Sequence, residues 1–309
     1  MARKLRIQYP GAIYHVLNRG NYKSDIFADQ GAAHAFVQTL EEAVERYGWR
    51  LGAYVVMRNH YHLALQTPEP NLAVGMHWLQ CTFATRFNRL RNERGHLFQG
   101  RYKAILLETE QDWARVADYI HLNPIRAGIV TPEHMGQFRW SSLMRFHKNM
   151  KFNGLSSLSW LHTHGVQDTP QGWEDYIEIL RGKHAEAPAS GGVEGGELSS
   201  GWAIGSAAWK VQTLKDALPD VEASESSEGL QIPREMLPVK WKIRLDQELK
   251  ELGKTSADLD ADRKSAPWKI QLAERLQREI GVSVAWMASE LRMGKPSSVR
   301  AYLWKYRKN

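Results

Sequence analysis

The chain has 309 residues, 43% of them hydrophobic and 10% aromatic, so it can form two domains with buried cores. Its single cysteine, Cys81, excludes an internal disulfide and a zinc site built from cysteines. The sequence has no apolar run of about 18 residues and no signal-peptide pattern, which argues against a membrane span and favours a cytoplasmic protein.

The net charge of +7 is distributed unevenly along the chain. Residues 1–130 contain 16 basic and 11 acidic side chains, residues 131–231 contain 8 and 13, and residues 232–309 contain 17 and 10. Two basic ends therefore flank an acidic middle. A basic surface attracts phosphate backbones by releasing counterions, whatever the sequence of the nucleic acid. The charge alone suits a nucleic-acid-binding protein and an ordinary basic protein equally well.

The first 130 residues alternate between strand and helix patterns. Residues 12–18 predict a strand, and residues 30–47 have apolar side chains at helical spacing up to a stop at Gly48. The β-rich runs 49–57 and 60–66 are separated by two residues, which predicts a hairpin. A helix, a strand and a helix follow at residues 71–90, 102–107 and 111–120. This order predicts an α+β fold with a ferredoxin-like (split βαβ) antiparallel sheet and helices on one of its faces.

The composition predicts four parts in the chain. Residues 1–150 contain the predicted sheet, and the Trp-rich residues 151–183 form a helical extension that packs on it. Residues 184–231 are rich in Gly, Ser and Glu, as linkers are, with one short helix near residues 206–217. Residues 232–309 form a small, basic, all-α C-terminal domain.

Three helices are predicted between residues 268 and 308 of that domain. Ser283 is suited to cap the second of them, and Ser297 the third. A short turn that contains Gly294 joins the second helix to the third, a pattern typical of a helix-turn-helix. We therefore predict DNA binding by this domain, with Arg300 and Lys305 of the last helix as candidate contacts. A purely structural three-helix bundle is the alternative.

The run Asn59-His60-Tyr61-His62 carries the first candidate chemistry. Side chains alternate along a strand, so His60 and His62 share one face while Tyr61 points to the other. Two neutral imidazoles on one face can hold one divalent ion, with positions left open for a phosphate oxygen and water. Two surface histidines on a strand are the simpler explanation of such a short motif. A second instance, His162-Thr163-His164, lies in no clear strand and we treat it as unrelated.

Tyr119 and Asn123 carry the second candidate chemistry. Residues four apart share one helix face, so these two side chains would project together. The Asn123 carbonyl oxygen can serve as a third metal ligand, and the Tyr119 hydroxyl can act as a nucleophile. Pro124 predicts a kink or a helix end at this point. His121 lies off the Tyr119 face, which suggests a structural role. A buried aromatic side chain is the simpler explanation of Tyr119.

These motifs and several others occur in a fixed order. They are Gly11-x-Ile13-Tyr14-His15-Val16, Arg19-Gly20-Asn21, Asn59-His60-Tyr61-His62, Gly100-Arg101-Tyr102-Lys103, Tyr119-Ile120-x-x-Asn123-Pro124-x-Arg126-Ala127-Gly128 and Trp140-Ser141-Ser142. Over residues 8–145 the chain thereby resembles the single-tyrosine HUH transposases, in particular their REP-associated tyrosine transposase (RAYT) branch. The C-terminal helix-turn-helix resembles an extension found in some members of that branch.

The resemblance implies that His60 and His62 bind Mg²⁺ or Mn²⁺, that Asn123 completes the metal site and that Tyr119 attacks DNA. It implies an endonuclease and strand transferase that cleaves single-stranded DNA at or near hairpin, REP-like repeats. Cleavage would form a covalent 5′-phosphotyrosine intermediate, from which the strands can be rejoined. The partner is single-stranded DNA with hairpin structure, together with duplex DNA for the C-terminal domain. The sequence does not distinguish a monomer from a dimer.

The candidate DNA contacts of the first domain are basic or polar side chains in or near these motifs. The phosphate backbone and unpaired bases favour such side chains. A solvated surface charge is an equally good explanation for each basic one. They are Arg19, Asn21, Arg86, Arg89, Arg101, Lys103 and Arg126.

Two other functions compete with this one. A non-catalytic DNA-binding regulator would use the helix-turn-helix and the basic surface, and would not need Tyr119. A zinc hydrolase would use His60 and His62 to activate water, but such sites usually have a third protein ligand and a general-base carboxylate. The nearest downstream acidic residue is Glu69, outside the histidine motif, which disfavours a hydrolase.

Overall fold

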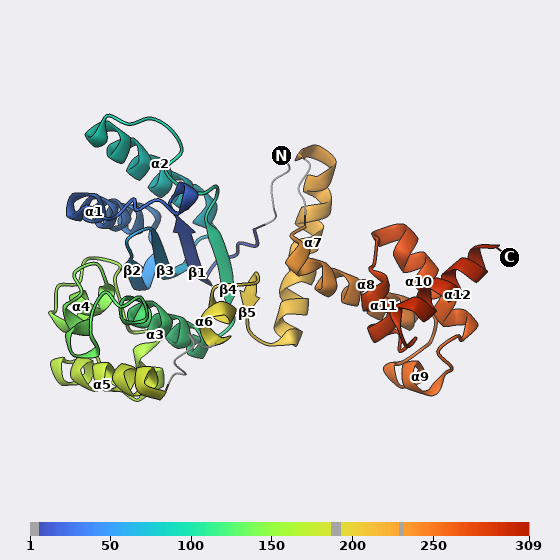
Figure 1. Ribbon diagram of the computed structural model, residues 1–309. Helices are drawn as coiled ribbons and strands as arrows, with labels where there is room; N and C mark the ends of the chain where they lie inside the picture. The colour runs from blue at the N-terminus through green and yellow to red at the C-terminus, as the bar shows by residue number, and fades with distance from the viewer. Residues whose placement is uncertain (1–5, 187–192, 229–231, 309) are drawn as a thin grey trace. The chain divides into compact units, whose positions relative to one another are not determined.

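The computed structural model describes residues 6–186, 193–228 and 232–308 (Figure 1). It divides into two compact units, here called the front unit (Arg6–Ser206) and the C-terminal unit, which starts at Ala207. Residues 187–192 and 229–231 of the predicted linker, and the first five residues of the predicted first domain, lie outside the described residues. The helices among the described residues are too short or too polar to cross a bilayer.

A five-stranded sheet of order β2-β3-β1-β4-β5 forms the centre of the front unit. Its strands are β1 (Ala12–Arg19), β2 (Arg50–Val56), β3 (His60–Thr67), β4 (Lys103–Leu107) and β5 (Ala203–Ile204). The first four pair antiparallel, as predicted, whereas β5 pairs parallel to β4. The sheet is therefore mixed, and the prediction of a purely antiparallel sheet was wrong at this edge. The fifth strand has only two residues, too few to produce a strand pattern in the sequence.

Helices cover both faces of this sheet (Figure 1), not one face as predicted. Helices α1 (Gln30–Tyr47) and α2 (Leu72–Arg91) lie on the face of Tyr61, whose ring centroid is 4.7 Å from that of Phe36. Helix α3 (Glu110–Arg126) lies on the opposite face against β2 and β3. The hydrophobic side chains of both strand faces need cover, and one layer of helices can bury only one of them.

The ends of α1 and α3 follow from local capping. Asp29 accepts a hydrogen bond from the Gly31 amide at the start of α1, and Gly48 ends that helix in the left-handed conformation. Thr109 and Asp112 form a capping box at the start of α3. Helix α3 continues through Pro124 to Arg126, so, of the kink or helix end predicted at this point, the helix end was wrong. The proline lies in the last turn, where its missing N–H removes a single helical hydrogen bond.

Residues 131–186 add an aromatic layer to the front unit. They form the 3₁₀ helices η2 (Pro132–Gln137) and η3 (Leu161–His164), with helices α4 (Ser142–His147) and α5 (Pro170–Glu186). Phe146 and Trp173 stack with ring centroids 4.6 Å apart, and the Trp160 indole donates to the Gly52 carbonyl at 3.0 Å. Helix α6 (Val193–Leu198) and β5 follow within the segment predicted as linker. That segment therefore contributes ordered elements to the front unit.

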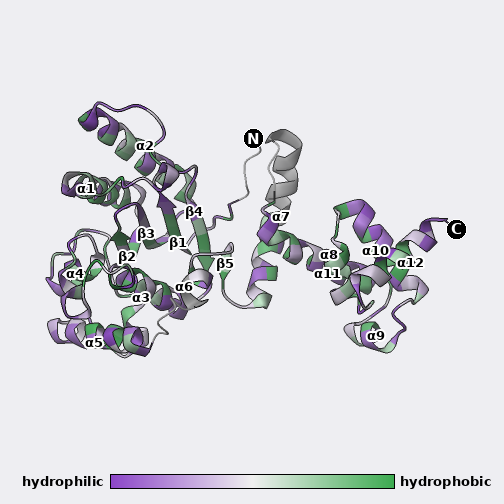
Figure 2. Ribbon diagram, viewed as in Figure 1, coloured by the Kyte–Doolittle hydropathy of each residue, from purple (hydrophilic) through white to green (hydrophobic). Residues whose placement is uncertain are grey.

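The C-terminal unit is all-helical. Its helices are α7 (Ala207–Glu228), α8 (Leu237–Glu251), α9 (Ser256–Ala261), α10 (Pro267–Ile280), α11 (Val284–Glu290) and α12 (Pro296–Lys308), with the short 3₁₀ helix η4 (Arg234–Met236) before α8. Leu272, Met287 and Leu303 belong to one buried apolar cluster. Helix α10 has hydrophilic and hydrophobic stretches, as expected of a helix with one buried face (Figure 2). Ser283 caps α11 as predicted, whereas Ser297 lies inside α12.

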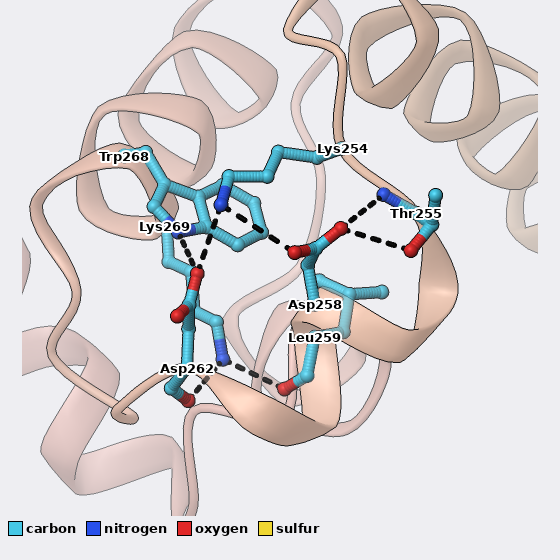
Figure 3. Close-up of polar contacts among 7 residues, drawn as sticks. All are labelled: Lys254, Thr255, Asp258, Leu259, Asp262, Trp268 and Lys269. Atoms are coloured by element: carbon cyan, nitrogen blue, oxygen red, sulfur yellow. Dashed lines mark hydrogen bonds and ion pairs between the residues drawn. The ribbon is translucent and has the colours of Figure 1, made fainter.

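A buried lysine attaches α9 to α10 (Figure 3). Lys269 donates to the carbonyls of Leu259 and Asp262 at 2.8 and 3.0 Å, at the end of α9 where helical carbonyls lack partners. The Trp268 indole donates to Asp262 at 2.8 Å, and Lys254 pairs with the same carboxylate at 3.1 Å. These contacts satisfy the polar groups that the α9–α10 connection brings together.

Candidate active site

Strand β3 presents two histidines to the face that α3 covers. His62 is buried, His60 is half-buried, and their ring centroids lie 5.1 Å apart. Tyr61, between them in the sequence, packs against Phe36 on the other face. The strand alternation predicted from the sequence therefore determines which side chains reach the site.

Helix α3 brings Tyr119 and Asn123 to these histidines. The half-buried Tyr119 ring lies with its centroid 5.4 Å from that of His62, in an edge-on arrangement. Asn123 donates from Nδ2 to the Tyr119 carbonyl at 3.2 Å, and His60 Nδ1 lies 2.7 Å from the side-chain oxygen of Asn59. The Arg126 guanidinium lies 5.4 Å from the centre of the Tyr119 ring. The four side chains for which the sequence predicted chemistry thus lie together.

A hydrogen-bonded chain behind His62 determines which of its ring nitrogens carries the proton. His15 Nδ1 lies 2.7 Å from the Leu198 carbonyl, which can only accept, so Nδ1 carries the His15 proton. In neutral His15 the other nitrogen, Nε2, is then an acceptor for His62 Nδ1 at 2.9 Å. His62 consequently has its lone pair on Nε2. An imidazole oriented in this way is suited to metal binding.

Burial keeps all three histidines neutral at pH 7. Desolvation lowers the pKa of fully buried His15 to about 4, despite the hydrogen bond to Leu198. Desolvation also lowers the pKa of His62 well below its usual value, and neighbouring His15 and His60 lower it further. The pKa of His60 is lowered by burial, although its hydrogen bond with Asn123 acts in the opposite direction. Neutral imidazoles repel a cation less than protonated imidazoles do, and each offers the cation a lone pair.

A cleft of about 670 Å³ contains this group of side chains. Four cationic side chains line it together with His60, His62 and Tyr119: they are Arg19, Lys23, Arg101 and Lys103. Arg19 donates to the Gln99 side chain, and Lys103 donates to the Ser199 carbonyl at 3.0 Å. A positively charged cleft attracts anionic groups such as phosphates.

Comparisons with known proteins find similarity to transposases. Residues 8–123 match the family described as transposase IS200 like. Over those residues, which are fewer than half of the chain, it is similar to this transposase family. A curated REP-associated tyrosine transposase of Haemophilus influenzae is 27% identical over 127 residues, which cover 38% of this chain and 69% of that protein. A solved structure of a REP-associated tyrosine transposase bound to a REP hairpin has a TM-score of 0.40 and 18% identity, and the match covers 52% of this chain and 91% of that one.

Members of the IS200-like family are single-tyrosine transposases, and the similarity to them is consistent with an enzyme. The family generally depends on a divalent metal. Among the described residues no three His, Cys, Asp or Glu side chains gather as a metal site. The donor set here is instead two imidazoles and one amide, His60, His62 and Asn123. Two nitrogen ligands and one oxygen ligand with open positions fit Mn²⁺, and Mg²⁺ if most of its other ligands are oxygens.

The other predicted DNA contacts are divided among three places. Asn21 lies in the loop after β1, and its backbone amide donates to the Leu97 carbonyl at 2.9 Å. Arg86 is bound to Glu42 by two contacts of 2.8 and 2.9 Å, and with Arg89 it lines a second groove on the α1–α2 side, beside glutamates. Arg300 and Lys305 are exposed on α12 of the C-terminal unit. The active-site cleft therefore includes neither Arg86 nor Arg89.

The sequence reasoning missed a second buried group, centred on Asp118 of α3. Asp118, next to Tyr119, accepts from the Tyr176 hydroxyl at 2.7 Å and pairs with His164 at 3.1 Å and with Lys183. Although burial by itself raises the pKa of Asp118, His164 and Lys183 lower it below its usual value. His164 belongs to the motif that we treated as unrelated to the metal site, and its place is indeed structural. His121 belongs to this group too, because its Nδ1 forms a hydrogen bond of 3.0 Å with the Tyr176 hydroxyl.

His15 was the other omission. It lies in one of the motifs that carried the family resemblance, but the sequence assigned it no role. Strand alternation was the available signal, because His15 sits diagonally opposite His62 on the neighbouring strand. Using that signal requires the pairing register of β1 and β3, which the sequence does not contain.

Proposed function

We propose that the protein is a metal-dependent endonuclease and strand transferase for single-stranded DNA, with Tyr119 as its nucleophile. The observation that carries the proposal is the position of the Tyr119 ring, 5.4 Å from the His62 ring, inside a cationic cleft. A phenol beside imidazoles and cationic side chains suits attack on a phosphodiester. The ferredoxin-like arrangement of β1 to β4 is the scaffold that we infer for this site.

The proposed reaction exchanges one phosphoester for another. The Tyr119 oxygen bonds to phosphorus, the bond from phosphorus to the 3′ oxygen breaks, and the products are a 5′-phosphotyrosine and a free 3′-hydroxyl. The phenol proton leaves to water in the open cleft, and the departing 3′ oxygen gains one. Attack by a 3′-hydroxyl on the phosphotyrosine reverses these steps and rejoins DNA without a nucleotide cofactor.

The side chains of the cleft divide this work. Arg126, beside the Tyr119 ring, adds a positive charge next to the phosphate that Tyr119 attacks. Arg19, Arg101 and Lys103 hold the phosphates on either side of the cleaved bond. Asn123, held by its hydrogen bond to the Tyr119 carbonyl, keeps its oxygen toward His60.

His60, His62 and Asn123 are the residues that would hold Mg²⁺ or Mn²⁺. When bound, the ion would offset the negative charge that develops on the phosphate oxygens. The lone pair of His62 Nε2, set by the chain through His15, is the feature of this site that supports such a role.

We infer a DNA substrate with hairpin structure, in analogy with the relatives described as REP-associated. We propose Asn21, two residues after Arg19, as a further contact to the unpaired bases at the foot of the hairpin. In the C-terminal unit, α11 and α12 form the proposed helix-turn-helix, and exposed Arg300 and Lys305 would contact duplex DNA. The front unit would then hold the catalytic domain with its helical extension, and the C-terminal unit the duplex-binding domain.

The test is covalent capture of labelled hairpin oligonucleotides by the purified protein with Mg²⁺ or Mn²⁺. We expect an adduct that survives denaturing electrophoresis and is absent with EDTA. Tyr119→Phe should abolish the adduct, because it removes only the attacking oxygen. The matched control is Tyr47→Phe on α1, which makes the same change on the opposite face of the sheet and should leave adduct formation intact.

The second candidate is a non-catalytic DNA-binding regulator, favoured by the basic α12 helix. It predicts that the wild-type protein binds the hairpin or duplex tightly yet forms no adduct under any metal condition. It also predicts that Tyr119→Phe binds and represses as well as the wild type. Adduct formation that depends on Tyr119 would exclude this candidate.

A further inference from the structure

Tyr22 is the most exposed of the large hydrophobic side chains among the described residues, at 92% of its maximum accessibility. It lies in the 3₁₀ helix η1 (Asn21–Lys23), directly after β1. Its backbone φ is +51°, and that of Lys23 is +59°. Two consecutive non-glycine residues in the left-handed region are uncommon and energetically unfavourable. A ring that packs against almost nothing cannot compensate for that cost within the fold.

The loop that carries Tyr22 is fixed at several points. The Gly20 amide donates to the Asn59 carbonyl at 2.8 Å, and Asn59 donates from its side chain to the Lys23 carbonyl at 3.2 Å. A Cβ on Gly20 would lie 2.3 Å from the Ser24 carbonyl oxygen, so the loop is closely packed there. These hydrogen bonds and this close packing therefore hold the loop in its unfavourable backbone conformation.

The loop also forms part of the wall of the active-site cleft. Arg19 and Lys23 both line the cleft, together with Asn59 and His60. Tyr22 directly precedes Lys23, so its Cα atom lies about 3.8 Å from that of a residue that lines the cleft. An exposed aromatic ring next to cationic side chains is the combination with which proteins bind single-stranded DNA, since bases stack on the ring and phosphates pair with the cations.

We propose that Tyr22 is a stacking platform for one unpaired DNA base next to the phosphate that Tyr119 attacks. This inference rests on the proposed function and adds a positioning residue to it. The base on Tyr22 and the phosphates on Arg19 and Lys23 would together place the scissile bond in the cleft. A base at that position stacks on the Tyr22 ring through its flat face. The interaction therefore favours any base over an abasic site and discriminates little among the four bases.

The experiment is a double-mutant cycle between protein and DNA. Adduct formation is measured for the wild type and Tyr22→Ala on a hairpin oligonucleotide and on versions with a single abasic site at each unpaired position near the cleavage point. We expect Tyr22→Ala to lower kcat/KM on the intact oligonucleotide about tenfold, the scale of one base–aromatic stack. At one abasic position the wild type should lose the same factor, and Tyr22→Ala should cause no further loss there.

Tyr22→Phe and Tyr22→Trp should retain the wild-type value, because both keep a stacking ring. The matched control is Leu158→Ala, which removes another exposed apolar side chain (75% exposed) and should have no effect. Binding is read separately from a 2-aminopurine placed in turn at each unpaired position of the oligonucleotide. At one position its fluorescence should be quenched by the wild type and not by Tyr22→Ala. This readout needs no cleavage.

The outcomes separate the two proposals. If the wild type forms no adduct with any oligonucleotide, the proposed function fails, and 2-aminopurine quenching alone decides about Tyr22. If the wild type forms the adduct and Tyr22→Ala matches it at every abasic position, the stacking platform is disproved while the proposed function stands. An additive loss, with Tyr22→Ala and each abasic site acting independently, also overturns the platform.

Discussion

Replacing His15 by phenylalanine tests the proposal that His15 orients His62 for metal binding. The substitution keeps an aromatic ring of similar size on β1 but removes the nitrogen that accepts from His62 Nδ1 at 2.9 Å. His62 is only 3% exposed, so water cannot easily replace that acceptor. An unsatisfied buried donor costs about 1–3 kcal/mol, and the imidazole can avoid the cost by moving its proton to Nε2.

The proton then occupies the nitrogen that faces the site, and a metal must first reverse the change. Removing such a supporting partner typically lowers metal affinity about tenfold to hundredfold. We therefore expect His15→Phe to bind Mn²⁺ about tenfold to hundredfold more weakly than the wild type. Direct titration of Mn²⁺ by calorimetry or water-proton relaxation measures this without DNA.

Tyr14→Phe is the matched control. Tyr14 is buried on the same strand but on the opposite face, and it loses a comparable hydrogen bond, from its hydroxyl to the Ile7 carbonyl at 3.1 Å. It should lose about 1 kcal/mol of stability and keep its Mn²⁺ affinity. Folded His15→Phe protein with the affinity of the wild type would refute the assignment of the His62 proton.

Three further predictions concern stability and DNA binding. Burial lowers the pKa of His15 to about 4 and that of His121 to about 3, so below about pH 6.5 the unfolded chain binds protons that the folded chain does not. The free energy of unfolding should therefore fall by about 1.4 kcal/mol per pH unit for each histidine as the pH drops toward 4. Urea unfolding at pH 7.5, 6 and 5 measures this slope, and its absence would contradict the prediction. Arg101→Ala should weaken binding of single-stranded DNA and reduce the salt dependence of the affinity by about one phosphate contact. Arg86→Ala breaks the pair with Glu42 and should alter stability instead. Filter binding at several salt concentrations measures both affinities, and a larger loss for Arg86→Ala than for Arg101→Ala would disprove the prediction. Asp118→Asn should lower the free energy of unfolding by about 3 kcal/mol, because the buried side chain loses its pairing with His164 and Lys183. Thermal or urea unfolding measures this loss. An unchanged free energy of unfolding would show that these contacts do not stabilise the position of α3.

Local geometry made the sequence informative about the site. Strand alternation placed His60 and His62 on one face, and helical spacing placed Tyr119 beside Asn123, because backbone geometry alone imposes both periods. The predicted element bounds of the first 130 residues differ from the observed ones mostly by one or two residues. Only the end of α3 departs further, since a proline in the last turn is tolerated.

Long-range contacts limited what the sequence could predict. His15 meets Leu198 across 183 positions, in a segment whose composition resembled a linker. Arg86 was predicted as a DNA contact from its own helix, and the structure pairs it with Glu42 on α1. Neither outcome depends on the period of a single element. Each depends on which elements pack together and on which charged partner lies nearest.

The sequence by itself therefore determined which residues share a face: the two histidines on β3, and the tyrosine and asparagine on α3. Only the tertiary structure decided that α3 covers the histidine face of the sheet, and that His15 and Leu198 support His62 from behind. The physical reason is that periodicity is a property of one backbone segment. The approach of two faces, and the proton position that follows from it, is a property of packing between segments remote in sequence.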